Sequence, residues 1–243
     1  METEDYLAAL RHAADAVVEA AAGHLDRPVP SCPAWDVADL IEHLALVWGW
    51  AADIVATGER AEWGAAPAGR SDEVLLPWAR RQAARLIDTL GAADPDGGCW
   101  TFGLPRTRRF WFRRQALETV LHAWDVQRAT GTAEVMDPAM AADGVDELVV
   151  VMVPRQLGRS PGTWAGETVH LHRTDGEGEW TVRLGPDGQA AVERGHGKAD
   201  VALRGPAEAL WLWATNRVPR EELPVETFGD ASLAARWTAG IAF

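Results

Sequence analysis

The period of the hydrophobic pattern changes along the chain, and this change limits the possible folds more than any other feature. From residue 3 to about residue 130, apolar side chains recur every three or four residues, which is the period of an amphipathic helix. From residue 167 onward, short runs such as Trp180-Thr-Val-Arg-Leu are typical of strands and are separated by glycine-containing turns. Helices followed by consecutive strands predict an α+β protein.

The first part of the chain is predicted to form a four-helix bundle. The expected helices span residues 3–22, 36–57, 71–90 and 107–130. Asp36 is a good N-cap for the second helix, and Gly58 and Gly131 are natural stops for the second and fourth. Helices of this length with connectors of uneven length favour a bundle.

The second part is predicted to be a small α+β domain. A further helical stretch is expected at 138–153, strands near 167–173, 180–184, 190–194 and 199–204, and helices at 206–215 and 230–240. We place the boundary in the loop before Pro138, because proline suits the first turn of a helix. The expected domains are therefore residues 1–137 and 138–243.

Composition excludes several classes of partner and location. A net charge of −13 argues against nucleic acid or an anionic membrane as the main partner. No apolar run comes close to the roughly 20 residues that cross a bilayer, and the acidic start Met-Glu-Thr-Glu-Asp does not fit a signal peptide. Cys32 and Cys99 lie far apart, which does not suggest a disulfide framework. A cytoplasmic protein is expected.

The most informative segment lies in the fourth predicted helix and reads Leu117-Glu118-Thr-Val-Leu-His122-Ala-Trp-Asp125. Glu118 and His122 are four residues apart, so their Cβ atoms lie about 5–6 Å apart on one helix face. A carboxylate and an imidazole at this spacing can chelate one cation. Asp125 continues the stripe three residues later and is a candidate partner that orients His122.

A third ligand must come from another element, and His43 is the best donor. It lies near the middle of the second predicted helix among apolar residues, where an unpartnered imidazole is costly to bury. Two histidines and a glutamate form a ligand set seen at catalytic zinc, with one position left for water or substrate. We predict that His43, Glu118 and His122 hold Zn²⁺ or another divalent ion. The spacing also fits an exposed ion pair, and His43 alone fits a hydrogen-bonded core histidine.

The remaining polar clusters are interpreted as surface. His170 and His172 share one face of a predicted strand, but no acidic or cysteine partner is evident in the sequence nearby, and His196 lies in a Gly-His-Gly turn. The run 106–114 contains five arginines and is interpreted as a solvated face. The alternative for this run is a site for anionic carboxylates close to the metal.

Three segments resemble a known family. Ser31-Cys-Pro-Ala-Trp-Asp-Val-Ala-Asp-Leu-Ile-Glu-His43-Leu resembles the Cys-Pro-x-Trp…Val-x-Asp-Leu-x-x-His-Leu signature of the mycothiol-dependent maleylpyruvate isomerase family. The segment Glu118-x-x-x-His122-x-Trp-Asp125 resembles the second signature of that family. The segment 199–213 is similar to its C-terminal domain.

The resemblance implies both a fold and a set of site residues. It implies a DinB-like bundle over residues 1–137, with His43, Glu118 and His122 as zinc ligands, and a sterol-carrier-like domain over residues 138–243. It also implies that Arg217 contributes to the active site, although this sequence reads Thr-Asn-Arg where a Gly-Arg pair is typical.

The function expected from these features is a zinc-dependent enzyme that uses the thiol mycothiol. Its thiolate would add to an electrophilic small molecule or keto acid, either as a cis–trans isomerase or as an S-transferase, in a monomer or homodimer. Two alternatives stay open, a non-catalytic small-molecule binding protein and a metal-dependent hydrolase on the same bundle.

Overall fold

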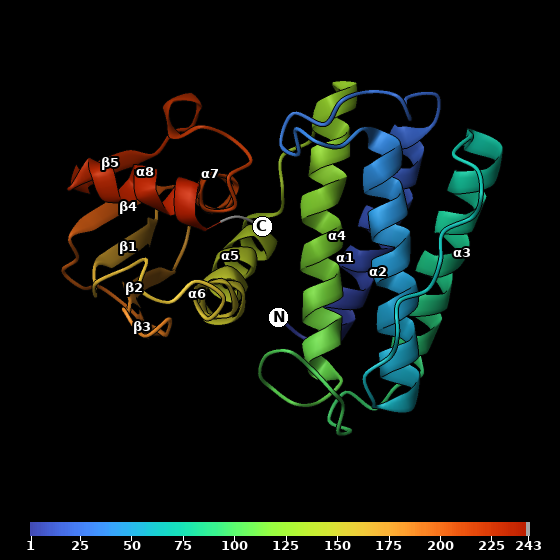
Figure 1. Ribbon diagram of the computed structural model, residues 1–243, viewed down its shortest axis with the longest axis horizontal. Helices are drawn as coiled ribbons and strands as arrows, with labels where there is room; N and C mark the ends of the chain where they lie inside the picture. Colours follow the sequence, from blue (N-terminus) through green and yellow to red (C-terminus); the bar gives the residue numbers. More distant parts are fainter. Residues whose placement is uncertain (242–243) are drawn as a thin grey trace. The chain divides into compact units, whose positions relative to one another are not determined.

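The computed structural model describes residues 1–241 and divides into two compact units, Met1–Glu134 and Val135–Phe243 (Figure 1). The first unit is helical and the second combines helices with a sheet. The α+β class predicted from the sequence is confirmed.

Within residues 1–134, four long helices lie side by side (Figure 1). These helices are α1 Thr3–Ala21, α2 Val37–Thr57, α3 Asp72–Gly91 and α4 Arg109–Thr130. Helix α1 packs against α3 and α4, and α2 packs against the same two helices. Each predicted helix is present, with ends within two residues of those expected.

The ends of α2 follow the local rules that the sequence suggested. The side chain of Asp36 accepts a hydrogen bond from the backbone N–H of Asp39 at 2.8 Å. In return, the side chain of Asp39 accepts one from the backbone N–H of Asp36 at 3.0 Å. The helix ends at Gly58, whose φ of 78° is the left-handed conformation that glycine adopts without steric cost.

Helix α2 also corrects one expectation about apolar length. Its 21 residues are long and apolar enough to cross a membrane by length and composition alone. In the bundle, 56% of its most apolar window is buried against other parts of the protein. A core helix passes the same test, and α2 supplies much of the core of this unit.

The second unit opens with a helical segment and continues into a sheet. Helix α5 spans Pro138–Glu147, a wider π-type turn follows over Leu148–Met152, and α6 spans Val153–Leu157. The strands are β1 Thr168–Arg173, β2 Glu179–Leu184, β3 Ala190–Arg194, β4 Val201–Gly205 and β5 Glu226–Gly229. Helix α7 covers Ala207–Ala214, a short 3₁₀ turn covers Arg220–Glu222, and α8 covers Ala231–Gly240.

The sheet is mixed, with the order β3-β2-β1-β4-β5 among the described residues. Strands β1 and β4 run parallel and the other neighbours run antiparallel. One face is apolar and packs against α7. Its residues include Val169, Leu171, Val182, Val201 and Leu203. Side chains alternate along a strand, so His170 and His172 lie on the opposite face. Strand β5, which was not predicted from the sequence, pairs with β4 and forms that edge of the sheet.

Close packing of α5 on α7 explains one glycine inside a helix. A Cβ atom at Gly144 would lie 2.3 Å from the ring of Trp211. The absence of a side chain at Gly144 therefore lets the large indole of α7 lie directly against the backbone of α5.

Candidate metal centre and family membership

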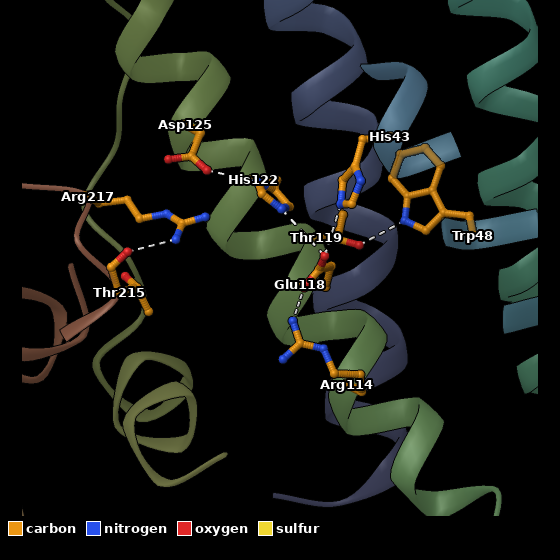
Figure 2. Close-up of polar contacts among 9 residues, drawn as sticks. All are labelled: His43, Trp48, Arg114, Glu118, Thr119, His122, Asp125, Thr215 and Arg217. Atoms are coloured by element: carbon orange, nitrogen blue, oxygen red, sulfur yellow. Dashed lines mark hydrogen bonds and ion pairs between the residues drawn. The ribbon is translucent and has the colours of Figure 1, made fainter. Parts of the chain in front are cut away.

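Helices α2 and α4 bring together the three side chains that the sequence singled out. His43 comes from the middle of α2, and Glu118 and His122 come from consecutive turns of α4. Figure 2 shows the three side chains pointing toward one another. Glu118 Oε1 lies 3.3 Å from His43 Nε2 and 3.5 Å from His122 Nε2. Their role as metal ligands remains a prediction.

The donor atoms fit one metal ion with tetrahedral ligands. Nitrogen and oxygen ligands lie about 2.0–2.1 Å from zinc, which places them about 3.3 Å from one another. The distances around Glu118 Oε1 match this spacing, and the three donor atoms all lie within 4.8 Å of one another. Two imidazoles and one carboxylate are a donor set that suits zinc and leave a fourth position open.

Asp125 holds the ring of His122 in the orientation that a metal ligand needs. The Nδ1–H of His122 donates to Asp125 Oδ2 at 2.8 Å, and the Ser31 hydroxyl donates to Asp125 Oδ1 at 2.5 Å. The side chain of Asp125 is fully buried. This contact holds one proton on Nδ1 and turns Nε2 toward Glu118, so Nε2 is the nitrogen available to a metal, which is the usual arrangement of a histidine ligand.

Arg114 keeps the Glu118 carboxyl ionised. Burial alone would raise the pKa of Glu118, but the Arg114 guanidinium and hydrogen bonds from His122 and His43 hold this pKa well below its usual range. Arg114 forms an ion pair with Glu118 Oε2 from one turn earlier on α4, so Oε1 faces the two imidazoles (Figure 2). The side chain of Arg114 is only 9% exposed. The interpretation of residues 106–114 as a solvated face is therefore wrong for this arginine.

The site is buried on the α4 side and open on the α2 side. The side chain of His122 is 9% exposed, whereas that of His43 is 33% exposed. The ring of Trp35 lies 5.0 Å from that of His43, and the rings of His43 and His122 meet edge to face at 5.3 Å. The indole N–H of Trp48 on α2 donates to the hydroxyl oxygen of Thr119 on α4 at 2.9 Å, which links the two helices. Solvent therefore reaches the site at His43.

Sequence reasoning missed three of these neighbours. Arg114 stands four residues before Glu118, a spacing that was visible as an i, i+4 pair. Ser31 and Trp35 lie in the connector before α2 and reach the site through tertiary structure, which spacing alone does not reveal.

Arg217 lies in the second unit, just after α7. Its Nη1 donates to the carbonyl oxygen of Thr215 at 2.9 Å, and its side chain is largely buried. The preceding residue, Asn216, has a φ of 60°. Asparagine tolerates this left-handed conformation better than most residues other than glycine. The Asn-Arg pair therefore preserves a backbone turn for which Gly-Arg is also suited.

The interpretation of His170 as a surface residue is wrong. His170 is 3% exposed and its Nε2 lies 3.0 Å from Glu179 Oε2. Glu179 also contacts His172 and His196. The acidic partner was missed because it comes from the next strand of the sheet.

Comparisons with known proteins agree with this architecture. Residues 6–127 match the mycothiol maleylpyruvate isomerase N-terminal domain, and residues 139–236 match the C-terminal domain of the same family. The crystal structure of a mycothiol-dependent maleylpyruvate isomerase has a TM-score of 0.64 at 14% identity, with 93% of each chain covered. A variant of that isomerase with one histidine replaced by alanine gives a TM-score of 0.59 at 13% identity and covers 93% of each chain.

Among sequence relatives, the uncharacterized protein Rv0738 of Mycobacterium tuberculosis is 29% identical over 148 residues. This match covers 58% of the present chain and 72% of the relative, and MT0763 from another strain of the same species gives the same values. The two domain matches together span nearly the whole chain in the family order. The chain therefore belongs to the mycothiol-dependent maleylpyruvate isomerase family.

Proposed function

We propose that this chain is a metal-dependent enzyme, with zinc as the expected ion, that uses mycothiol to isomerise a maleylpyruvate-type cis keto acid. The observation that carries the proposal is the convergence of His43 Nε2, Glu118 Oε1 and His122 Nε2 on one point. Three protein ligands would leave the fourth position of a tetrahedral ion for the thiol. Family membership supports the choice of thiol and of reaction. The proposed location is the cytoplasm.

A divalent ion held by these residues would lower the pKa of a thiol ligand and favour the thiolate. The chain's own residues prepare the site for that role. Asp125 fixes the tautomer of His122, and Arg114 keeps Glu118 ionised. The partly exposed ring of His43 leaves a path by which thiol and substrate enter.

In the proposed reaction the thiolate sulfur adds to one carbon of the cis double bond, forming a carbon–sulfur bond and an enolate. The former double bond is now single and rotates. Collapse of the enolate breaks the carbon–sulfur bond, returns the trans isomer and releases the thiolate unchanged. An S-transferase would share the first step and retain the carbon–sulfur bond, so net thiol consumption separates the two reactions.

Arg217 is proposed to assist this reaction on the strength of the family resemblance. A guanidinium is suited to a keto-acid carboxylate, because it donates two parallel hydrogen bonds. We expect Arg217→Lys to raise KM for the keto acid because the bidentate fork is lost. Metal content should stay unchanged, and a simultaneous loss of metal would point to a structural role instead.

Metal analysis combined with turnover tests the proposal. Purified chain should contain bound zinc, and it should convert maleylpyruvate in the presence of mycothiol without net loss of thiol. His122→Ala should lose the ion of this site and the activity while keeping most of its helicity by circular dichroism. His12→Ala, on the exposed face of α1, is the matched control and should keep both.

Two results would overturn the proposal. A wild-type chain that takes up no divalent metal is not the enzyme described. If His122→Ala retains metal at this site, His122 does not belong to the ligand set.

A further inference from the structure

A second group of potential ligands lies on the polar face of the sheet in the C-terminal unit. Strands β1 and β2 pair antiparallel, with His172 opposite Glu179 and His170 opposite Thr181. This register places His170, His172 and Glu179 next to one another on one face. His196, two residues after β3, joins them, and its ring lies 5.7 Å from that of His170.

Three imidazole nitrogens converge on a single carboxylate oxygen. Glu179 Oε2 lies 3.0 Å from His170 Nε2, 3.3 Å from His172 Nδ1 and 3.0 Å from His196 Nδ1. A carboxylate oxygen offers about two lone-pair sites, so three donors exceed what one oxygen can bond well. The four donor atoms lie within 4.8 Å of one another, and the three distances are close to the spacing of about 3.3 Å around a tetrahedral zinc ion.

The surrounding backbone fixes His196, the fourth member of this group, in its position. Gly195 has a φ of 108°, and its N–H donates to the backbone oxygen of Glu179 at 2.9 Å. A Cβ atom at Gly197 would lie 2.9 Å from Thr181 Oγ1, so a larger residue there would collide with β2. The two glycines let the turn pass close to the sheet and place His196 above Glu179.

His170 has an orienting contact like that of a metal ligand. Its Nδ1 lies 2.9 Å from the hydroxyl oxygen of Thr181, and its Nε2 faces Glu179. A histidine ligand is usually held in this way through its second ring nitrogen.

We propose that His170, His172, Glu179 and His196 form a second metal site that binds Zn²⁺ or a similar divalent ion preferring nitrogen ligands. Four protein ligands complete a tetrahedron, which is typical of structural rather than catalytic zinc. The ligands come from β1, from β2 and from the turn after β3. A bound ion therefore fastens this turn to the centre of the sheet.

Zinc binding by the full-length chain tests this site independently of the helical one. After chelation, the protein is equilibrated with ZnCl₂ and its metal content is measured by mass spectrometry. Wild type should bind two equivalents, while His196→Ala and His122→Ala should each bind one. The double variant should bind none. His196 is 81% exposed, so its replacement is not expected to impair folding. Zinc should also raise the Tm of His122→Ala but not that of the double variant.

The control is Glu177→Gln, an exposed carboxylate on the same hairpin, which should keep both equivalents. Loss of a direct ligand should weaken zinc binding at this site by more than the roughly 10–100-fold that follows from loss of a group that orients a ligand. The proposal is overturned if wild type binds only the equivalent that His122→Ala removes, or if His196→Ala binds as much zinc as wild type. Retention of both equivalents by His122→Ala would instead overturn the helical site alone.

Discussion

The two clusters of histidine and glutamate contain the same types of side chain but lie on different secondary structures. In the N-terminal unit, two helices supply three donor atoms. The Arg114 guanidinium pairs with Glu118, and the buried Asp125 carboxylate accepts a hydrogen bond from His122. In the C-terminal unit, two strands and a turn supply four donor atoms, and the orienting group of His170 is a hydroxyl. Three ligands leave a position for a substrate, whereas four close the ion off. In our proposal, ligand number and supporting charge, rather than histidine content, distinguish the reactive site of the helical unit from the structural site of the sheet.

The largest difference is expected when each central carboxylate is neutralised in chelator-treated protein. Glu118→Gln removes the negative charge that pairs with the buried Arg114 guanidinium, which should lower the free energy of unfolding by about 3 kcal/mol. Glu179→Gln removes the negative charge of the acceptor that these imidazoles share and should cost about 1–2 kcal/mol. Urea unfolding measures both values. Glu193→Gln, on the exposed part of β3, is the control and should change stability by less than about 0.5 kcal/mol. Equal losses of unfolding free energy in Glu118→Gln and Glu179→Gln would contradict the proposed difference between the two sites.

A smaller difference is expected from the groups that orient the histidines. Asp125→Asn weakens a charged acceptor for the Nδ1–H of His122 and should reduce zinc affinity at the helical site about 10–100-fold. Thr181→Val removes a neutral partner of His170 and should reduce affinity at the sheet site less, by about tenfold or below. Competition with a chromophoric chelator gives both constants. A larger effect from Thr181→Val would contradict the assignment of roles.

The smallest effect concerns protonation of the metal-free protein. Burial alone would lower the pKa of His122, but Asp125 and Glu118 raise it above the usual 6.5. For His170, burial lowers the pKa below 6.5 despite the contact with Glu179. The two histidines should therefore titrate on opposite sides of 6.5 in NMR spectra assigned with His122→Gln and His170→Gln.

The signs of the linked stability changes follow from these directions. His122 contributes stability that is present below pH 6.5 and is lost as pH rises through its raised pKa. His170 contributes stability that is present above pH 6.5 and is lost as pH falls through its lowered pKa. Titration of both rings on the same side of 6.5 would contradict this account.

Much of the fold was predictable from the sequence because its signals are local. Asp36 and Gly58 mark the ends of α2, and the change of hydrophobic period separates helices from strands. Strand β5 was not predicted, because its four residues Glu226–Gly229 carry little apolar pattern and gain their partner only by pairing with β4.

The two candidate sites differ in how much of them the sequence displays. Glu118 and His122 share a helix, so their spacing of four residues places them on one face, and Arg114 follows the same rule. The pairing of His43 with them depends on how α2 packs against α4, which no local spacing specifies. Glu179 was not predicted, although its position relative to the hairpin turn indicates that it pairs with His172. His172 lies three residues before the turn at Asp175-Gly176, and Glu179 lies three residues after it.

The central claim is that His43, Glu118 and His122 hold one divalent ion, and anomalous diffraction tests it most directly. Crystals of the chain grown with zinc, measured on both sides of the zinc absorption edge, should show an anomalous peak about 2.0–2.1 Å from His43 Nε2 and His122 Nε2 and from a Glu118 oxygen. Anomalous density elsewhere in zinc-loaded crystals, with none among these three side chains, would contradict the claim.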